Sequence, residues 1–151
     1  MKQNKNTSSN NSPRKASMQT YHFLRSLTHI NLTRPSSPLH RRSRAIRRAA
    51  YVSMARAASP RRMWTRAILG RLQLLRRARL LRRRRNYKKK TTISTPHDKL
   101  RRLVPGGEEM DFCRLLEETA DYAEFLSKQV RIMRSVVDFM EAECRKKEEK
   151  V

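Results

Sequence analysis

The sequence predicts an all-α protein: a disordered N-terminus, then basic helices, then a short helix, a tight loop and a long C-terminal helix. Three observations support this fold class. From Asp111 onward the chain contains neither Gly nor Pro, and its apolar residues recur at helical spacing. Directly before this segment, Pro105-Gly106-Gly107 marks a loop. Residues 39–58 are rich in Ala and Arg, which favour a helix although their small apolar side chains offer little to pack.

Charge is divided unequally along the chain, whose formal net charge is +24. Residues 1–102 hold 29 of the 37 Lys and Arg residues and one acid, Asp98, whereas residues 103–151 hold 8 basic and 12 acidic residues. Dense positive charge favours polyanions such as nucleic acid or an anionic membrane surface, and it equally suits a solvated localisation signal. The opposite signs of the two parts predict two separate roles.

Residues 1–38 are expected to form a disordered or weakly structured arm. Residues 1–20 are rich in Asn, Ser and Lys and contain almost no apolar side chains. Residues 21–32 have enough apolar periodicity for a short helix or a docking peptide, and prolines follow them. The arm lacks an apolar signal core, and the chain has no run of about 18 apolar residues, so we expect neither secretion nor a membrane span.

Residues 39–90 are predicted to form a basic helical region. Ser59-Pro60 is a suitable N-cap and first position for a helix that runs toward Arg85. One stripe of this helix is apolar and the other faces are rich in arginine; the stripe comprises Trp64, Ile68, Leu72, Leu75 and Ala78. Such a helix suits packing against another helix, contact with nucleic acid or membrane, or exposure to solvent; we favour the first.

A cluster of positive charge ends this region, with 10 Lys and Arg residues in the 15 positions of residues 76–90. Clusters of this kind are typical of nuclear localisation signals and of phosphate-binding patches. Attraction between arginine and phosphate does not depend on base sequence, so the cluster does not indicate sequence-specific recognition. We therefore expect the protein in the nucleus, and the candidate signal comprises Arg82, Arg83, Arg84, Arg85, Lys88, Lys89 and Lys90.

A short helix is predicted from Pro96. Thr95 is a suitable N-cap, proline fits the first helical position, and the carboxylate of Asp98 suits the helix dipole. The β-branched residues at 91–93 together with Pro96 argue against a helix continuing from the basic region. One apolar face results, and it comprises Leu100, Leu103 and Val104. About two helical turns are unstable alone, so this helix requires a partner surface.

The long C-terminal helix carries an apolar seam whose residues alternate at spacings of four and three. We call it the outer seam; it comprises Phe112, Leu116, Thr119, Ala123, Leu126, Val130, Met133, Val137, Met140 and Cys144. This periodicity is that of a coiled coil. The stripe is widened beyond a two-stranded seam by Leu115, Tyr122, Val136 and Phe139. A helix so long must bury its stripe, either on the Trp64 helix of its own chain or on a second chain; we favour the second.

The string "LRRLVPGG" followed by "MDFCRLLEETADYAEFLSKQVRIM" resembles the helix–loop–helix of plant basic helix–loop–helix regulators. It is most similar to the atypical subgroup that opposes growth-promoting helix–loop–helix factors in brassinosteroid and gibberellin responses. "IRRAAYVSMA" and "RRMWTRAILGRL" also resemble the region that precedes the motif in that subgroup, so the resemblance covers roughly residues 40–140.

The resemblance implies a helix–loop–helix dimerisation domain over residues 94–144, followed by a charged tail over residues 145–151. Members dimerise through a parallel four-helix bundle to which each chain gives two helices. By resemblance, the first helix contributes Leu100, Leu103 and Val104 to the bundle core, and the second contributes Leu116, Ala120, Leu126 and Val130. Together with Ala123, Met133 and Val137 of the outer seam, these residues form the candidate dimerisation surface.

DNA-binding members also need a basic helix that runs unbroken into the first helix, and a glutamate that reads bases. This chain departs from both requirements, because Pro96 interrupts the helix and residues 1–97 contain no acid. A glutamate accepts a hydrogen bond from a base amino group and so selects the site, whereas arginines bound to phosphates only hold the protein in place. We therefore expect no specific DNA reading.

The resulting hypothesis is a nuclear regulator that forms heterodimers with helix–loop–helix activators and antagonises them. The resemblance implies repression of cell elongation. The sequence leaves open whether homodimers also form; weak nonspecific contact with nucleic acid is expected, but no membrane or small-molecule partner. The alternative is a general nucleic-acid-binding protein, associated with RNA or chromatin, that uses residues 41–90; the outer seam argues against it, because a polyanion binder does not need one.

No catalytic residue, metal ligand or cofactor is predicted. The three glycines form no phosphate-binding loop, and a Ser–His–Asp arrangement has no local signature. The histidines lack ligand spacing; they are His22, His29, His40 and His97. Cys113 and Cys144 also lack metal-ligand spacing, and we expect both to be reduced thiols of an intracellular protein.

Overall fold

The computed structural model describes residues 12–81 and 95–149, all within helices or the short turns between them. The helices are α1 (Ser12–Thr33), α2 (Leu39–Ala57), α3 (Met63–Leu81), α4 (Pro96–Leu103) and α5 (Phe112–Glu148), with a 3-10 turn η1 (Gly107–Glu109) between the last two. The prediction of an all-α protein with a long C-terminal helix is confirmed. In this part of the chain, no helix is apolar over a stretch long enough to cross a bilayer.

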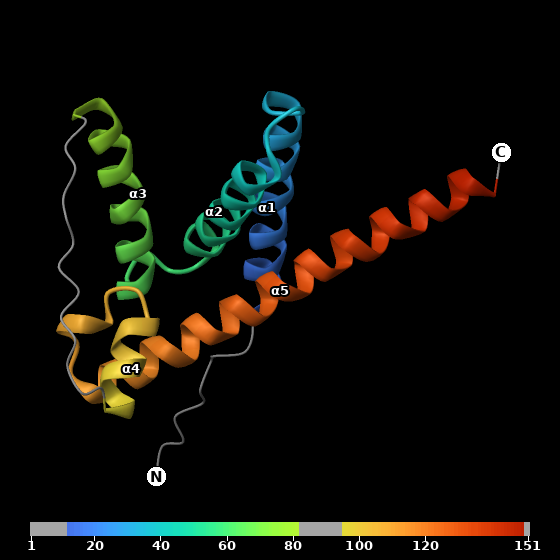
Figure 1. Ribbon diagram of the computed structural model, residues 1–151. Coiled ribbons are helices and arrows are strands. Elements are labelled where there is room, and N and C mark those ends of the chain that lie inside the picture. The colour runs from blue at the N-terminus through green and yellow to red at the C-terminus, as the bar shows by residue number, and fades with distance from the viewer. Residues whose placement is uncertain (1–11, 82–94, 150–151) are drawn as a thin grey trace, which may run out of the picture.

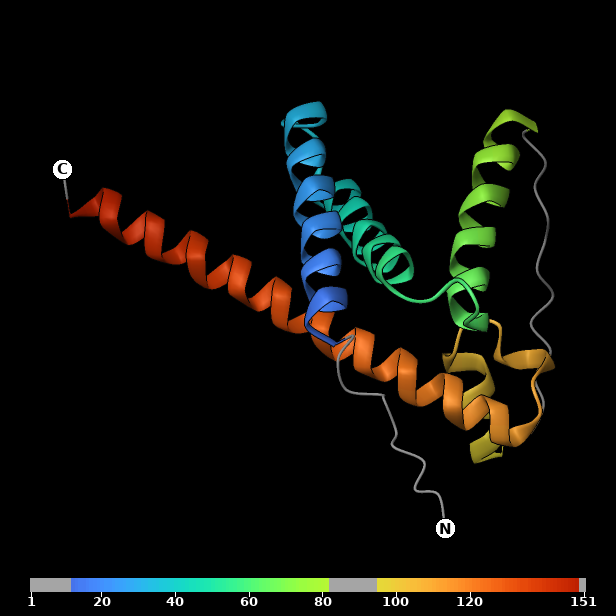
Figure 2. The ribbon, with the colours of Figure 1, turned by 180° about the vertical axis from the view of Figure 1, so that it is seen from behind.

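Helix α5 contacts each of the other four helices, and α1, α2 and α3 lie on the same side of it (Figure 1). It has 37 residues, which corresponds to about 55 Å at about 1.5 Å per residue. Helices α1 and α2 pack side by side and meet the middle of α5, while α3 and α4 lie near its beginning. The view from behind (Figure 2) shows the same arrangement, in which the C-terminal part of α5 extends beyond all the other helices.

Helix α1 is longer than the short helix expected over residues 21–32, and it begins within the segment expected to be disordered. The cause is tertiary packing. Phe23 is 2% exposed and forms a cluster with Ala49 and Ala50 of α2. The small side chains of α2, which seemed to offer little to pack, allow α1 to approach closely enough to bury this ring. A long-range contact therefore stabilises a helix that local composition disfavours.

Helix α3 begins at Met63, later than the predicted start at Ser59-Pro60. Residues 59–62 form a turn instead, in which the backbone N–H of Arg62 donates to the carbonyl of Ser59 at 3.2 Å. The Ser59 hydroxyl accepts from the N–H of Arg61 at 3.4 Å. This turn separates α2 from α3, so that the two helices run in different directions.

The predicted start of α4 is confirmed in detail. Thr95 is the N-cap and Pro96 the first helical residue; the Thr95 hydroxyl accepts from the N–H of Asp98 at 3.2 Å, and the Thr95 N–H donates to the Asp98 carboxylate at 3.1 Å. These reciprocal hydrogen bonds form a capping box. The Thr95 hydroxyl also donates to the Asp98 carboxylate at 2.8 Å, and this bond, together with the one from the Thr95 N–H, lowers the pKa of Asp98 because both favour its ionised form.

The predicted loop after α4 is also confirmed. Gly106 has φ of 79°, a left-handed conformation that glycine adopts without a steric cost. Arg101 of α4 donates hydrogen bonds to the carbonyl oxygens of Gly107, at 3.3 Å, and of Met110. Asp111 then caps α5 by accepting from the N–H of Arg114 at 3.0 Å. Short-range signals thus determine where α4 ends and α5 begins.

One core joins elements from both parts of the chain. We call it the central core; its buried residues are Met54, Ala55, Ala58, Trp64, Ile68, Val104, Met110, Leu115, Tyr122 and Phe125. They come from α2, α3, α5 and the two loops adjoining them. The basic region and the C-terminal helices therefore fold together.

Candidate protein-interaction surface

Helix α5 has a buried stripe and a separate exposed apolar seam rather than one wide apolar stripe. We call the buried one the inner stripe; it comprises Leu115, Glu118, Tyr122, Phe125 and Gln129. At about 100° per residue, its mean direction lies roughly 90° around the helix axis from that of the outer seam. The inner stripe faces the rest of the chain, so the two stripes can serve different partners.

Trp64 is the main contact between α3 and the inner stripe. Its side chain is fully buried, with its ring centroid 5.3 Å from that of Tyr122 and 5.4 Å from that of Phe125. The indole Nε1–H donates to Oδ2 of Asp121 at 2.9 Å, so the polar edge of the buried ring is satisfied. Of the two sequence-based alternatives, burial against the Trp64 helix therefore holds for the inner stripe.

Two carboxylates of α5 bind the N-terminal end of α3 through a hydrogen bond and ion pairs. Glu118 is almost completely buried and accepts from the backbone N–H of Trp64 at 3.2 Å. The Arg62 side chain lies 3.4 Å from Asp121 and 3.8 Å from Glu118. A helix N-terminus is the positive end of its dipole and its first N–H groups lack helical partners, so negative charge is stabilised there. The carboxylates near the beginning of α5 thereby stabilise the packing of the arginine-rich α3 against it.

A buried polar cluster joins α1, α2 and α5. The Gln19 Nε2 group donates to the carbonyl of Phe125 at 3.1 Å and to Oε1 of Gln129 at 3.0 Å. The Ser53 hydroxyl donates to the same Gln129 oxygen at 3.0 Å. All three side chains are buried, so removing one of them would leave a buried polar group without that partner. Sequence reasoning missed this cluster, because a glutamine within a helix has no pattern that distinguishes it from a surface residue.

Tyr122 lies in a part of the inner stripe from which water is largely excluded. Its side chain is 8% exposed, and burial, together with the neighbouring Tyr51 hydroxyl, raises its pKa to about 12. Desolvation disfavours the phenolate, so the hydroxyl stays neutral throughout the physiological range.

The predicted first-helix residues of the dimerisation surface are divided between two environments. Val104 is 3% exposed and belongs to the central core, and Leu100 packs partly against that core. Leu103 is 72% exposed and projects into solvent. Within the described structure, Val104 is therefore enclosed by its own chain, whereas Leu103 is accessible to another one.

The outer seam lies open along α5. Its most exposed large side chains are Phe112, Leu116, Val130, Val137 and Met140, and Met133 is 36% exposed. Ala120 and Ala123 are also exposed, while Leu126 packs partly against the central core. A row of exposed apolar side chains along one helix is typical of an interaction surface. The predicted second-helix residues therefore lie on or beside one accessible face.

The candidate localisation signal at residues 82–85 and 88–90 lies outside the described residues. The basic region that precedes it exposes arginines on α2, namely Arg41, Arg44 and Arg47. Among the residues described, no three His, Cys, Asp or Glu side chains are placed to hold a metal ion. Cys113 and Cys144 are free and exposed on α5.

Comparison with known proteins gives three findings. A family model described as "IBH1-like, N-terminal domain" matches residues 14–76, a range that covers most of α1 to α3. "Transcription factor IBH1" of Oryza sativa subsp. indica is 39% identical over 158 aligned positions, which cover 80% of this chain and 77% of that protein; the subsp. japonica protein is 38% identical with the same coverage. "Transcription factor IBH1-like 1" of Arabidopsis thaliana is 56% identical over 45 residues, covering 29% of this chain and 25% of that protein. No solved structure matches significantly.

Proposed function

Because the chain belongs to the IBH1 family of plant transcription factors, we propose that it is a nuclear transcriptional regulator that acts through heterodimers. Its partners are helix–loop–helix activators, which it antagonises by occupying their dimerisation helices. The consequence in the plant is reduced cell elongation and growth, in opposition to brassinosteroid-dependent activators. The names of the relatives support regulation of transcription; the exposed seam supports the mode of action.

The observation that carries the proposal is the state of the outer seam. The inner stripe of α5 is covered by the chain itself, through Trp64 and its neighbours. The outer seam keeps exposed large apolar side chains in the folded protein, including Leu116 and Val130, each 47% exposed. Exposing such a row costs hydration free energy that a second helix would recover. Its heptad spacing matches a helical partner.

The beginning of α4 supports antagonism rather than DNA reading. Its capping box starts the helix at Pro96, so α4 is not a continuation of a basic reading helix. No acid precedes Asp98, so the glutamate that would select a base is missing. A dimer between this chain and an activator therefore has one reading half. Because specific binding uses two half-sites, the loss of one costs about 2–5 kcal/mol of discrimination, roughly half of the total.

The second candidate function is general binding of nucleic acid through residues 41–90. Arg41, Arg44 and Arg47 are exposed on α2, and no acid is present among residues 1–97 to neutralise them. Phosphate contacts of this type provide affinity without selecting a sequence. Such binding is compatible with heterodimer formation and would retain the dimers near chromatin.

Replacing Leu116 and Val130 together by glutamate tests the heterodimer. Uncompensated carboxylates buried in a helix interface are strongly unfavourable, so we expect affinity for purified helix–loop–helix domains of growth-promoting plant activators to fall about 100-fold or more. Both side chains are exposed in the free chain, so its unfolding free energy should change by about 0.5 kcal/mol or less. Isothermal titration and chemical denaturation measure the two quantities. Val130 is chosen rather than Leu126 because Leu126 packs partly against the central core.

The matched control for this variant is Phe139→Glu. Phe139 is an exposed apolar residue of α5. The prediction that it widens the apolar stripe is wrong, because at about 100° per residue it lies on the far side of the helix from the outer seam. The Phe139→Glu chain should bind activator domains with the affinity of the wild type. Unchanged binding by the Leu116→Glu, Val130→Glu chain would contradict the proposal.

Nuclear import is tested by replacing Arg82, Arg83, Arg84 and Arg85 by alanine. The chain is small, at 17.9 kDa, so it is fused to a fluorescent passenger large enough to prevent passive diffusion. We expect the fusion to lose most of its nuclear accumulation, because import requires the clustered positive charge. The control removes exposed arginines elsewhere, through Arg41→Ala, Arg44→Ala and Arg47→Ala, and should remain nuclear. Equal nuclear fluorescence of both variants would exclude residues 82–85 as the signal.

A further inference from the structure

The C-terminal part of α5 joins the α1–α2 cluster through Ile132 in its first turn, and beyond that turn it carries exposed apolar side chains. It projects past α1 to α4 in both views of the molecule (Figures 1 and 2). We call residues 130–148 the zipper segment, since the outer seam continues through it as Val130, Met133, Val137, Met140 and Cys144. Four of these five residues are exposed apolar side chains of substantial size, and the fifth, Cys144, is an exposed thiol. The seam and its flanking charges are therefore accessible to a partner here.

The spacing of the seam assigns a heptad position to every flanking residue. With Val130, Val137 and Cys144 at position a and with Met133 and Met140 at position d, the flanks follow directly. Within the segment, position e holds Arg134, Glu141 and Glu148, and position g holds Val136 and Glu143. In a parallel pair of helices, position g of one chain lies beside position e of the following heptad of the other. These flanking positions determine which chains can pair.

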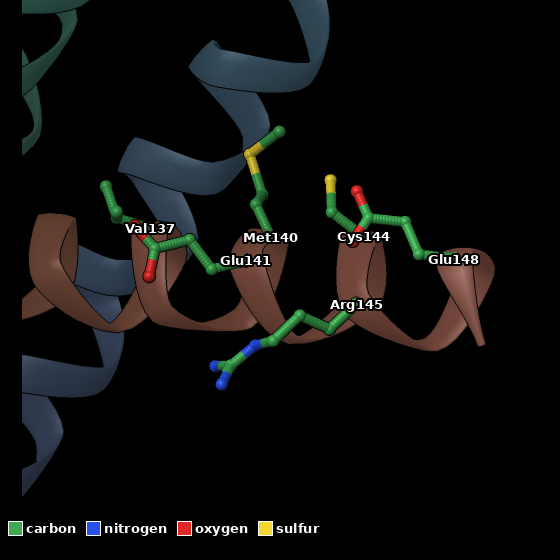
Figure 3. A pocket seen from close by; sticks show the side chains of 6 residues that line it. All are labelled: Val137, Met140, Glu141, Cys144, Arg145 and Glu148. Carbon is green, nitrogen blue, oxygen red and sulfur yellow. The ribbon is translucent and has the colours of Figure 1, made fainter.

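A shallow groove lies at the end of the zipper segment, and both seam residues and flanking charged residues line it (Figure 3). Its lining residues are Val137, Met140, Glu141, Cys144, Arg145 and Glu148. Met140 and Cys144 project from one side of the helix, while Arg145 extends along the opposite edge, away from both sulfur atoms. Glu141 and Glu148 are exposed, and neither forms a salt bridge with another described residue. The groove therefore offers an apolar floor beside two carboxylates that are not neutralised.

A second copy of the chain fits this groove poorly. In a parallel homodimer, Glu143 of each copy would lie beside Glu148 of the other, and Val136 would lie beside Glu141. Like charges at facing positions are destabilising, and a valine gives a carboxylate no compensating hydrogen bond. Glu143 is partly neutralised by Lys146, at 3.2 Å in its own helix, which reduces but does not reverse this effect. Neither facing pair in the zipper segment's last two heptads is attractive.

We propose that the zipper segment pairs in parallel with a helix of a different chain that carries Lys or Arg opposite Glu141, Glu143 and Glu148, and that the same carboxylates disfavour the homodimer. This inference rests on the proposed heterodimer and adds the chemistry by which the partner is chosen. Charges at these flanks commonly select among chains whose apolar seams are alike.

The test uses two helical peptides and the full chain. The peptides have the same apolar heptads, complementary to residues 130–148, and differ only in Lys or Glu at every e and g position. We expect the wild-type chain to bind the Lys peptide about tenfold more tightly than the Glu peptide, from several charge pairs acting together. This preference should decline at 1 M salt, where the screening length is about 3 Å.

A charge-reversal variant supplies the second arm. Glu141→Lys with Glu148→Lys should prefer the Glu peptide, and it should also self-associate at lower concentration than the wild type in sedimentation, because each Glu143 would then face a lysine. The control, Asp138→Lys with Glu149→Lys, makes the same change of net charge at exposed positions b and f, which face away from the seam. It should keep the wild-type preference for the Lys peptide.

Equal binding of the two peptides, or binding of neither, would overturn the charge rule, and so would wild-type self-association as strong as that of the reversed variant. These outcomes are separate from failure of the heterodimer itself. If activator domains still depend on Leu116 and Val130 while charge has no effect, the heterodimer stands and only the partner rule is rejected.

Discussion

Replacing Trp64 by alanine is expected to lower the free energy of unfolding by about 3–5 kcal/mol, the largest effect of any single substitution considered. The side chain is fully buried, its ring packs against Tyr122 and Phe125, and its N–H is hydrogen-bonded to Asp121. Alanine would leave a cavity at the junction of α3 and α5 and a carboxylate without its donor. Urea denaturation followed by circular dichroism measures the change.

The control for this substitution is Leu74→Ala on the same helix. Leu74 is 66% exposed, so its truncation should change the unfolding free energy by about 0.5 kcal/mol or less. Similar denaturation midpoints for the Trp64→Ala and Leu74→Ala chains would show that α3 does not pack on α5 through Trp64.

Replacing Gly107 by alanine is expected to cost about 2–3 kcal/mol, because the added methyl group has no space. A Cβ at this position would lie 2.7 Å from the carbonyl oxygen of Arg101 and 3.1 Å from a methyl group of Leu115. The first neighbour is backbone, so relief requires α4 and α5 to move apart. The affected junction is the one that holds α4 against the beginning of α5, and denaturation again gives the magnitude.

Gly70→Ala is the matched control, because nothing lies within 4 Å of a Cβ built at Gly70 in the interior of α3. Alanine favours a helix over glycine by about 0.8–1 kcal/mol, so this variant should be more stable than the wild type. Two substitutions of the same chemical type should therefore have opposite signs. A Gly107→Ala chain as stable as Gly70→Ala would contradict the close approach of α4 to the loop.

The sequence was sufficient to predict the elements that local interactions determine. Thr95, Pro96 and Asp98 identify the first turn of α4 because a capping box lies within four consecutive residues. The loop and the N-cap of α5 are equally local, since they depend on a left-handed glycine and on the side chain of Asp111. Such signals act over one turn and need no knowledge of the rest of the fold.

The division of α5 into two stripes could not be predicted in the same way. Both stripes have helical spacing, so periodicity alone cannot show which one the chain covers. The answer depends on contacts such as Trp64 with Phe125 and Gln19 with Gln129, whose partners lie far apart in sequence. The same long-range contacts explain why α1 is a long helix although its composition is that of a disordered arm.

These contacts assign distinct roles to the two parts of the chain. Helices α1 to α3 cover the inner stripe and are joined to α5 by the Arg62 ion pairs and the buried glutamine cluster. The first half of the outer seam is then presented on a helix that is packed against the rest of the chain. A partner that meets a preformed helix loses less conformational entropy on binding, which favours competition with other dimers.

The central claim is that a helix–loop–helix partner covers the outer seam while the inner stripe stays packed within the chain. Methyl NMR of the labelled chain, titrated with an unlabelled activator domain, tests it most directly. We predict shifts of the methyl signals of Leu116, Val130 and Val137, with those of Leu115 and the indole N–H of Trp64 unchanged. Shifts at Leu115 and Trp64, with the outer seam undisturbed, would show that the partner displaces α3 and would contradict the account.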